Sequence, residues 1–178
     1  MKRLIALSLS LLLLLVAPAW AADVPAGPEA GQPAADFKLQ DQKGKWHTLA
    51  DYKGEYLVLY FYPKNFTPGC TDEVCAFRDD IHALKKAGAK VVGVSLDDVK
   101  SHAEFAEKHS VPFPLLSDAK QDTARAYGVL ASKMGFDYAR RETFLIGPDG
   151  TVVKRYRDVD PKDNVKQVLA DLAKTKAG

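Results

Sequence analysis

The chain has 178 residues, of which 47% are hydrophobic, 27% are charged and 10% are aromatic. This length and composition fit one globular domain, and they exclude a second full-sized domain and a disordered chain. Lys2 and Arg3 are the only charged residues among the first 21, so the rest of the chain holds 23 of the 25 basic residues and all 23 acidic ones. This balance, with no long basic stripe, gives no support to nucleic-acid binding.

The first 21 residues have the three parts of a secretory signal peptide. Met1–Arg3 is a basic head, Leu4–Val16 is an apolar run, and Ala19–Ala21 fits the small-x-small cleavage pattern. A retained membrane anchor is the alternative, because Leu4–Trp20 spans about 17 residues, the lower limit for crossing a bilayer. We expect a cleaved signal over residues 1–21, export to the bacterial periplasm, and no stable membrane association afterwards.

Residues 22–32 are rich in Ala, Pro and Gly and show no periodicity. This composition predicts a flexible linker. We expect the folded domain to occupy residues 33–178.

The domain alternates strand and helix patterns. In chain order we expect a hairpin of 36–40 and 45–48, a buried strand Tyr56–Tyr62, a helix from Cys70 to Gly88, a strand Lys90–Ser95, a helix Lys100–His109, a strand Phe113–Leu116, a helix Lys120–Tyr127, a hairpin of Glu142–Ile146 and Thr151–Tyr156, and a helix Pro161–Lys174. This order predicts an α/β domain with a mixed sheet and helices on both faces. The thioredoxin-like fold has this order of elements.

Cys70 falls in the first turn of the helix that follows the buried strand. Thr67 has the residue type of a helix N-cap, and Pro68 suits the first helical position. The free N–H groups and the dipole at a helix start favour an anion, and a thiolate is such an anion. The position indicates a reactive cysteine; the alternative is a buried, inert one.

Two acidic residues, Asp72 and Glu73, follow Cys70 closely. They disfavour a thiolate if their side chains point toward it. Helical spacing allows both to face solvent, and a cation from elsewhere in the chain would favour the thiolate.

The second cysteine, Cys75, lies five residues after Cys70 in the same predicted helix. Five helical residues advance about 7.5 Å along the axis and turn the side chain to a different face. The Cα atoms are then more than about 7 Å apart, too far for a disulfide, unless the helical turn opens. A permanent structural disulfide would need that turn always unwound, whereas transient opening suits a redox cycle.

The segment Pro63–Cys70 reads PKNFTPGC and matches the signature P-x-x-x-T-x-x-C. On this motif the chain resembles the peroxiredoxins, and within them the bacterioferritin-comigratory or Q-type group, which places a second cysteine five residues later, as Cys75 is here. The resemblance covers almost all of Pro33–Ala170.

The resemblance implies a role for each of several residues. Cys70 would be the peroxidatic cysteine and Cys75 the resolving one. Thr67 would hydrogen-bond the thiolate and the peroxide, and Pro63 would shield the pocket; from spacing alone, these two residues fit a plain helix cap and a rigid loop equally well. The family also uses an arginine in an R-x-S/T-F context, and Arg141, in RETF, fits this context where its neighbour Arg140 does not.

The implied activity is thiol-dependent reduction of hydrogen peroxide and organic hydroperoxides. The thiolate becomes a sulfenic acid, Thr67 and Arg141 stabilise the leaving oxygen, Cys75 forms a disulfide, and a thioredoxin-like dithiol protein restores both thiols. No metal or organic cofactor is expected, and by analogy with the group we expect a monomer.

Two other functions compete with this interpretation. A copper-delivery protein of thioredoxin-like fold would have C-x-x-x-C, and a thiol–disulfide oxidoreductase would have C-x-x-C; this chain has neither spacing. Its histidines, His47, His82, His102 and His109, show no metal-binding spacing. We expect His102 and His109, on one predicted helix, to be solvated.

Overall fold

The computed structural model describes residues 26–175, so the predicted signal peptide, residues 1–21, lies outside the described residues. Its elements in chain order are β1 (Lys38–Asp41), β2 (Trp46–Thr48), the 3₁₀ helix η1 (Leu49–Tyr52), β3 (Tyr56–Phe61), α1 (Pro68–Asp79), α2 (Ile81–Lys86), β4 (Ala89–Ser95), α3 (Val99–Lys108), β5 (Leu115–Ser117), α4 (Asp122–Ala126), β6 (Leu130–Lys133), β7 (Phe136–Ala139), β8 (Glu142–Ile146), β9 (Val152–Tyr156) and α5 (Asn164–Thr175). Within residues 26–175 each helix is too short or too polar to cross a bilayer.

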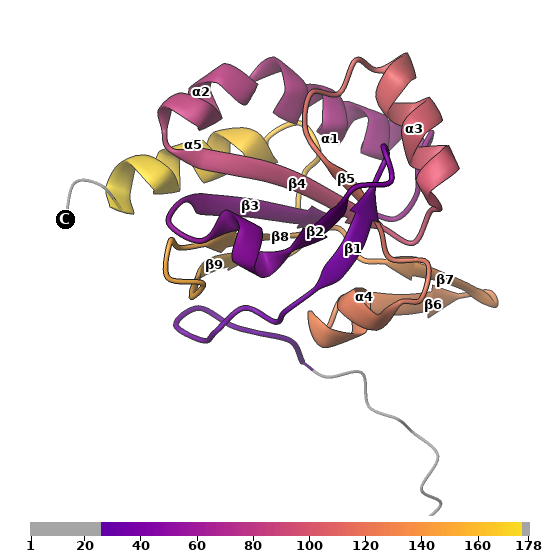
Figure 1. The fold of residues 1–178 in the computed structure, drawn as a ribbon, viewed down its shortest axis with the longest axis horizontal. Coiled ribbons are helices and arrows are strands. Elements are labelled where there is room, and N and C mark those ends of the chain that lie inside the picture. The colour runs from indigo at the N-terminus through magenta and orange to yellow at the C-terminus, as the bar shows by residue number, and fades with distance from the viewer. Residues whose placement is uncertain (1–25, 176–178) are drawn as a thin grey trace, which may run out of the picture.

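Seven of the strands form one mixed sheet in the order β2-β1-β5-β4-β3-β8-β9 (Figure 1). The central strands β3, β4 and β5 run parallel, while β1 pairs antiparallel with β5, and β8 pairs antiparallel with β3 and β9. The predicted α/β class, with a mixed sheet in a thioredoxin-like order, is confirmed.

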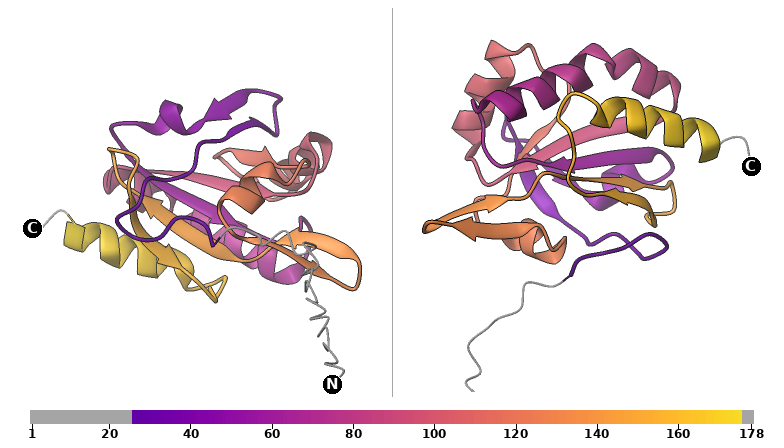
Figure 2. Two further views of the ribbon diagram at one scale, coloured as in Figure 1. Left: turned by 90° about the horizontal axis from the view of Figure 1, so that it is seen from below. Right: turned by 180° about the vertical axis from the view of Figure 1, so that it is seen from behind.

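Both faces of the central strand β3 are buried, which explains its unbroken apolar sequence. Val58 and Tyr60 pack with α1, α2, α3 and α5 on one face, and Leu57, Leu59 and Phe61 pack with α4 and η1 on the other. Figures 1 and 2 show the same division, with helices on both sides of the sheet. This arrangement places the end of β3 between two cores, so the loop that follows starts from a rigid point.

Gly93 on β4 leaves room for the ring of Tyr60 on β3. A Cβ atom at this glycine would lie 2.7 Å from the hydroxyl oxygen of Tyr60. A larger residue would therefore displace the aromatic ring that packs on Phe77 of α1, with ring centroids 4.7 Å apart.

Several features differ from the predicted elements, among them the unpredicted 3₁₀ helix η1. The predicted helix from Cys70 to Gly88 divides at Asp80, which has φ −93° and ψ 9° and separates α1 from α2. The β6–β7 hairpin, which projects from the body in Figure 2, was not predicted. Its turn has Met134 at φ 54° and Gly135 at φ 80°, and methionine is not a residue type that signals such a turn.

Residues 26–32, predicted as part of a flexible linker, are hydrogen-bonded to the outer strand β9. The N–H of Gly31 donates to the carbonyl of Val152, and the N–H of Val152 donates to the carbonyl of Gln32, both at 2.8 Å. Pro33 continues the contact as a bridge to Thr151. Composition does not predict this, because the contacts use backbone groups of a strand more than 100 residues away in the sequence. We call residues 26–33 the N-terminal arm.

Candidate active site

Cys70 lies in the first turn of α1, where the loop from β3 enters the helix. Thr67 is the N-cap residue and Pro68 is the first helical residue, as the sequence predicts. The side chain of Cys70 is only 2% exposed. The sulfur therefore sits at the positive end of the helix and is largely shielded from water.

The hydroxyl of Thr67 does not cap the helix with its side chain, although the residue occupies the N-cap position. It donates instead to the carbonyl of Lys64 at 3.0 Å, which closes the turn before the helix. Thr67 and Pro63 are both half-buried residues of the loop between β3 and α1.

Arg141 reaches Cys70 from the start of β8. This is possible because β8 pairs with β3, with Glu142 opposite Phe61, the last residue of β3. The Nη2 atom of Arg141 donates to Sγ of Cys70 at 3.2 Å, and Nη1 donates to a carboxylate oxygen of Glu73. We call Cys70, Glu73 and Arg141 the inner network.

Glu73 does not face solvent as its helical position allowed. Its side chain is fully buried, because position 73 lies three residues from Cys70 and four from Phe77 on the face of α1 that contacts the sheet. Its Oε2 atom pairs with Arg141, whereas Oε1 has no hydrogen-bond partner in the described structure.

Burial raises the pKa of Glu73 to about 8, with Arg141 acting in the opposite direction. Burial also acts to lower the pKa of Arg141, but Glu73 and Cys70 raise it more, so the guanidinium stays charged. One buried cation thus faces two groups that can carry negative charge, the carboxylate and the thiolate.

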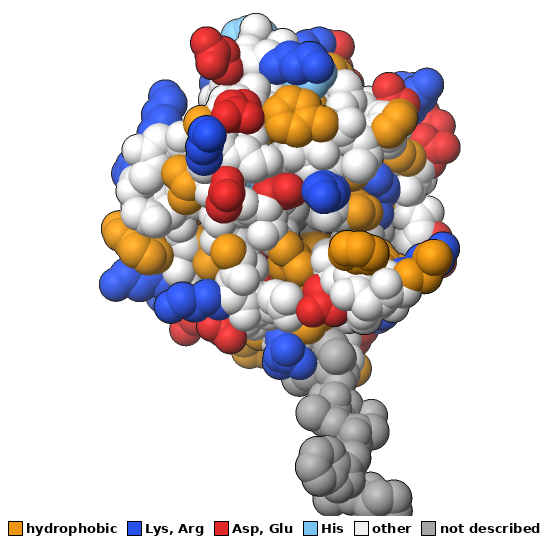
Figure 3. Space-filling model, turned by 90° about the vertical axis from the view of Figure 1, so that its right-hand side faces the viewer, with side chains coloured by type: hydrophobic (Ala, Val, Ile, Leu, Met, Phe, Trp, Pro, Cys, Tyr) orange, Lys and Arg blue, Asp and Glu red, His pale blue; other side chains and the backbone are white. Residues whose placement is uncertain are grey.

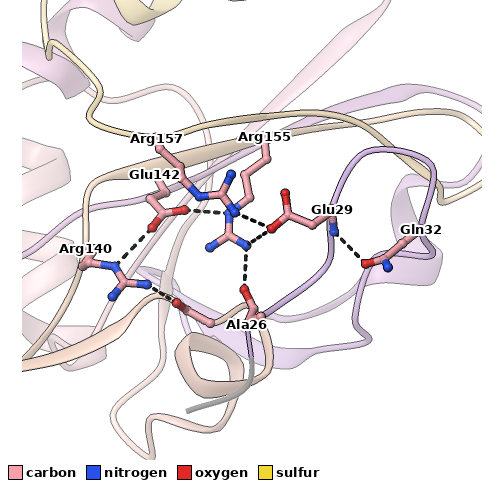
Figure 4. A network of polar contacts seen from close by, with 8 residues as sticks. Ala26, Glu29, Gln32, Arg140, Glu142, Arg155 and Arg157 are labelled. Carbon is pink, nitrogen blue, oxygen red and sulfur yellow. Dashed lines mark hydrogen bonds and ion pairs between the residues drawn. The ribbon is translucent and has the colours of Figure 1, made fainter. Parts of the chain in front are cut away.

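Arg140, the neighbour of Arg141, points to a different set of residues (Figure 4). It donates to Glu142 at 3.1 Å and to the carbonyl of Gly128. Glu142 also accepts from Arg155 at 2.7 Å, and Arg155 and Arg157 both donate to Glu29 of the N-terminal arm. We call Glu29, Arg140, Glu142, Arg155 and Arg157 the outer network.

Sequence patterns gave no reason to select Asn65, which is buried in the loop between β3 and α1. Its N–H donates to Asp97 at 2.9 Å, and its amide nitrogen donates to Ser101 at 2.9 Å and to Nδ1 of His102 at 3.1 Å. The hydroxyl of Tyr62 donates to its amide oxygen at 2.8 Å. These bonds fix the loop that leads to Thr67, and the next residue, Phe66, adopts φ 62°, which is uncommon for a residue with a side chain.

The prediction that His102 is solvated is wrong. The ring is fully buried, and its Nε2 atom donates to the carbonyl of Leu116 at 3.1 Å. Burial lowers the pKa of His102 to about 4, so the imidazole is neutral. A signal existed, because His102 lies three residues before the buried Phe105 on one face of α3. His109 is partly exposed, and its ring contacts that of Phe105 with centroids 4.9 Å apart.

Cys75 lies further along α1, which is helical through both cysteines. Both are free thiols, so the permanently unwound turn that a structural disulfide requires is not present. Cys75 is partly exposed and packs at the edge of the core between the helices and the sheet.

A groove of about 500 Å³ reaches Arg141 from the surface, and its lining includes Tyr138, Arg140, Arg157 and Val159. A buried thiol at a helix start with an arginine donating to its sulfur, on a thioredoxin-like fold, defines a thiol-based redox enzyme.

Comparison with known proteins narrows this class. Residues 30–155 match the AhpC/TSA family. Peroxiredoxin Bcp of Bacillus subtilis (strain 168) is 44% identical over 148 residues, which are 81% of this chain and 94% of that protein. The chain belongs to the AhpC/TSA family, in its peroxiredoxin Bcp/Q group, and it is a thiol peroxidase.

Solved structures agree with this assignment. A mutant of PrxQ from Xylella fastidiosa superposes with a TM-score of 0.79 at 34% identity, covering 85% of this chain and 98% of its own. The bacterioferritin comigratory protein of Xanthomonas campestris, described for its alkyl peroxide reduction activity, gives a TM-score of 0.74 at 40% identity, covering 78% and 91%.

Proposed function

We propose that Cys70 is the peroxidatic thiol of this peroxidase and Cys75 its resolving thiol, in an exported protein that a thioredoxin-like dithiol protein reduces. The observation that carries the proposal is the 3.2 Å contact from Arg141 to the sulfur of Cys70 at the start of α1. A fixed cation and a helix N-terminus favour the thiolate, the form that attacks peroxides.

In the first step the thiolate of Cys70 attacks one peroxide oxygen. An S–O bond forms, the O–O bond breaks, and the leaving oxygen departs with a proton as water or an alcohol. Cys70 is oxidised by two electrons to a sulfenic acid, and the peroxide is reduced. Arg141 stabilises the charge that develops on the leaving oxygen, because its guanidinium is already fixed beside the sulfur.

Thr67 and Pro63 border this reaction. The hydroxyl of Thr67 can rotate from the carbonyl of Lys64 to the incoming peroxide, since the bond that it now makes, at 3.0 Å, is exposed and can be exchanged. Pro63 has no N–H group, so it limits the polar groups that compete with the peroxide at the entrance.

In the second step the first turns of α1 open and the thiol of Cys75 attacks the sulfenic sulfur. The S–S bond forms and water leaves. A dithiol protein then attacks the disulfide, and after exchange both cysteines are thiols again while the reductant carries the disulfide. The opening is needed because the helix separates residues 70 and 75 by about 7.5 Å along its axis.

Hydrogen peroxide and organic hydroperoxides are both proposed substrates. The groove beside Arg141 includes Tyr138 and Val159, which give apolar surface for an organic substituent. The alkyl peroxide reduction activity described for the Xanthomonas campestris relative supports this range.

We also propose that residues 1–21 are removed, that the protein works in the bacterial periplasm, and that it is a monomer. The basic head, the apolar run and Ala19–Ala21 support export. N-terminal sequencing of protein from its native host should find a start near Ala22, and soluble cytosolic protein that begins at Met1 would refute export.

Peroxide-consumption kinetics test the activity itself. Protein without residues 1–21 should consume hydrogen peroxide and an organic hydroperoxide with a thioredoxin-like donor, and Cys70→Ser should abolish both reactions. Consumption that persists at the wild-type rate in Cys70→Ser would refute the assignment of the peroxidatic thiol.

A further inference from the structure

We propose that the N-terminal arm is a clasp that sets the position of Arg141, so that Glu29 is a positioning residue for the reaction with peroxide. The inference rests on the proposed role of Arg141 at Cys70. It concerns a segment that composition alone predicts to be a linker, and the contacts of the outer network carry it (Figure 4).

The N-terminal arm contacts Arg155, an almost fully buried cation on β9. Its side chain is 3% exposed, and it donates to the carbonyl of Ala26 at 2.7 Å, to Glu29 at 2.9 Å and to Glu142 at 2.7 Å. Its guanidinium also lies 5.0 Å from the ring centroid of Phe144. Two of its three hydrogen-bonding partners belong to the arm, so the arm satisfies a charge that the rest of the fold leaves incompletely paired.

The arm is fitted to the body closely. Gly27 adopts φ 76°, and a Cβ atom there would lie 2.0 Å from the carbonyl oxygen of Tyr127. Pro28 is buried. Glu29 holds Arg157 as well as Arg155, and hydrogen bonding to Arg157 is the main cause that lowers the pKa of Glu29, so this carboxylate is charged at neutral pH.

The path from the arm to Arg141 is short. Glu29 holds Arg155, and Arg155 holds Glu142, the residue bonded directly to Arg141 in the chain. Arg140, on the other side of Arg141, is held by Glu142 and by the carbonyl of Gly128, beside the place where Gly27 packs. Both neighbours of Arg141 are thus fixed by groups that the arm covers.

Fixing both neighbours matters because the donor atom of Arg141 is at the end of a long side chain. A small rotation of the backbone at the start of β8 moves Nη2 relative to the sulfur of Cys70. Misplacement of a reacting group by about 1 Å lowers the rate by up to about a hundredfold. The clasp therefore affects the chemical step although Glu29 contacts Arg155 and Arg157 rather than Cys70.

The test uses the Cys75→Ser chain, in which Cys70 is the single thiol, and measures the rate constant for one equivalent of hydrogen peroxide. Glu29→Ala removes the carboxylate, and Gly27→Ala lifts the arm from Tyr127. Each should lower the rate constant by about tenfold. Glu55→Ala is the matched control, because Glu55 makes an exposed ion pair with Lys90 at 3.4 Å on another part of the sheet; it should leave the rate unchanged.

The same substitutions are then made together with Arg141→Ala. If Glu29 acts through Arg141, Glu29→Ala should slow the chain that has Arg141 and have no further effect on the chain that lacks it. An equal loss in both chains would mean general loosening and would overturn the inference. Thermal unfolding checks that each variant is folded, and Glu29→Gln, which keeps the size and loses the charge, replaces Glu29→Ala if that variant is not.

Two failures can be distinguished. If Arg141→Ala is slow while Glu29→Ala and Gly27→Ala react like the parent, the clasp is wrong and the role of Arg141 stands. If Arg141→Ala itself reacts at the parent rate, the proposed role of Arg141 is wrong, and the clasp falls with it.

Discussion

Arg140 and Arg141 are neighbours in the sequence, but Arg140 belongs to the outer network and Arg141 to the inner network. In the outer network the buried carboxylate of Glu142 accepts from Arg140 and Arg155 through its two oxygens, and one oxygen of the partly exposed Glu29 accepts from both Arg155 and Arg157. In the inner network Arg141 serves both Glu73 and Cys70, and one oxygen of Glu73 has no partner in the described structure.

The difference indicates what each network does. Buried polar groups are normally paired, so the outer network, whose buried carboxylate Glu142 is paired through both oxygens, stabilises the fold. An incompletely paired buried carboxyl group beside a thiol costs stability, and sites of this kind are where reactive groups are found. The chain separates the two tasks by consecutive residues, Arg140 and Arg141, in the short connection between β7 and β8.

Cys75 belongs to neither network, and replacing it should have the largest effect on turnover. Cys75→Ser leaves Cys70, Thr67 and Arg141 unchanged, so one equivalent of peroxide should be consumed at close to the wild-type rate. Multiple turnover with a dithiol protein should then be lost, because no intramolecular disulfide forms. Stopped-flow kinetics separate the two phases.

The same prediction can be checked on the oxidised protein. Mass spectrometry should find a Cys70–Cys75 disulfide in the wild type and sulfinic acid at Cys70 in Cys75→Ser at high peroxide. Oxidised wild type without that disulfide would instead indicate a one-cysteine mechanism with an external thiol.

The comparison of the two arginines is tested directly by replacing each in turn. Arg141→Ala should slow the first step by about a hundredfold or more, the usual cost of removing a donor that stabilises developing negative charge. Its pH profile should shift to higher pH, because the cation beside the thiolate is gone. Arg140→Ala should slow the reaction much less, since its partners are Glu142 and Gly128. Equal effects of the two substitutions would contradict the assignment.

Replacing a carboxylate of the outer network should lower the free energy of unfolding. Glu142→Ala removes one of the two carboxylates that pair with the buried guanidinium of Arg155, which keeps Glu29 and the carbonyl of Ala26. Breaking a buried ion pair from one side costs about 3–5 kcal/mol when the charge is left unpaired. Because Arg155 keeps Glu29, the free energy of unfolding should fall by an amount near the lower end of that range. Urea denaturation measures it. Glu73→Gln, in the inner network, is the comparison and should cost less, because the amide keeps an oxygen that can accept from Arg141.

Local patterns predicted the strands of the seven-stranded sheet, most helices and the thioredoxin-like order, because strand and helix periodicity depends on nearby residues. The position of Cys70 at a helix start also follows from local signals, Thr67 and Pro68. The partners of Arg140, Arg141 and Arg155 could not be read in this way, because they are contributed by segments far away in the sequence.

The burial of Glu73 and of His102 could be predicted in part from local patterns. Each lies on a helix face with large apolar residues, Phe77 and Phe105, at helical spacing, so its burial was accessible to pattern analysis. The charge of Glu73 and the polarity of His102 predicted solvent exposure instead. Their partners, Arg141 for Glu73 and Asn65 for His102, resolve that conflict in the folded chain.

His102 gives the smallest expected effect and adds a buried polar group that has no ionic partner. Its pKa is about 4 in the folded protein and 6.5 ordinarily, so as the pH falls below about 6.5 the unfolded chain binds a proton before the folded one does. The stabilising effect of a neutral His102 is therefore present at pH 7 and is lost progressively between about pH 6.5 and pH 4, by about 3 kcal/mol in total. Burial raises the pKa of Asp118 to about 6, which acts in the opposite direction over part of this range, so the wild-type curve alone is not diagnostic. The difference in unfolding free energy between the wild type and His102→Gln removes the contribution of Asp118. That difference should shrink by about 3 kcal/mol between pH 7 and pH 4 in urea denaturation, and a constant difference would show that His102 is not held neutral by burial.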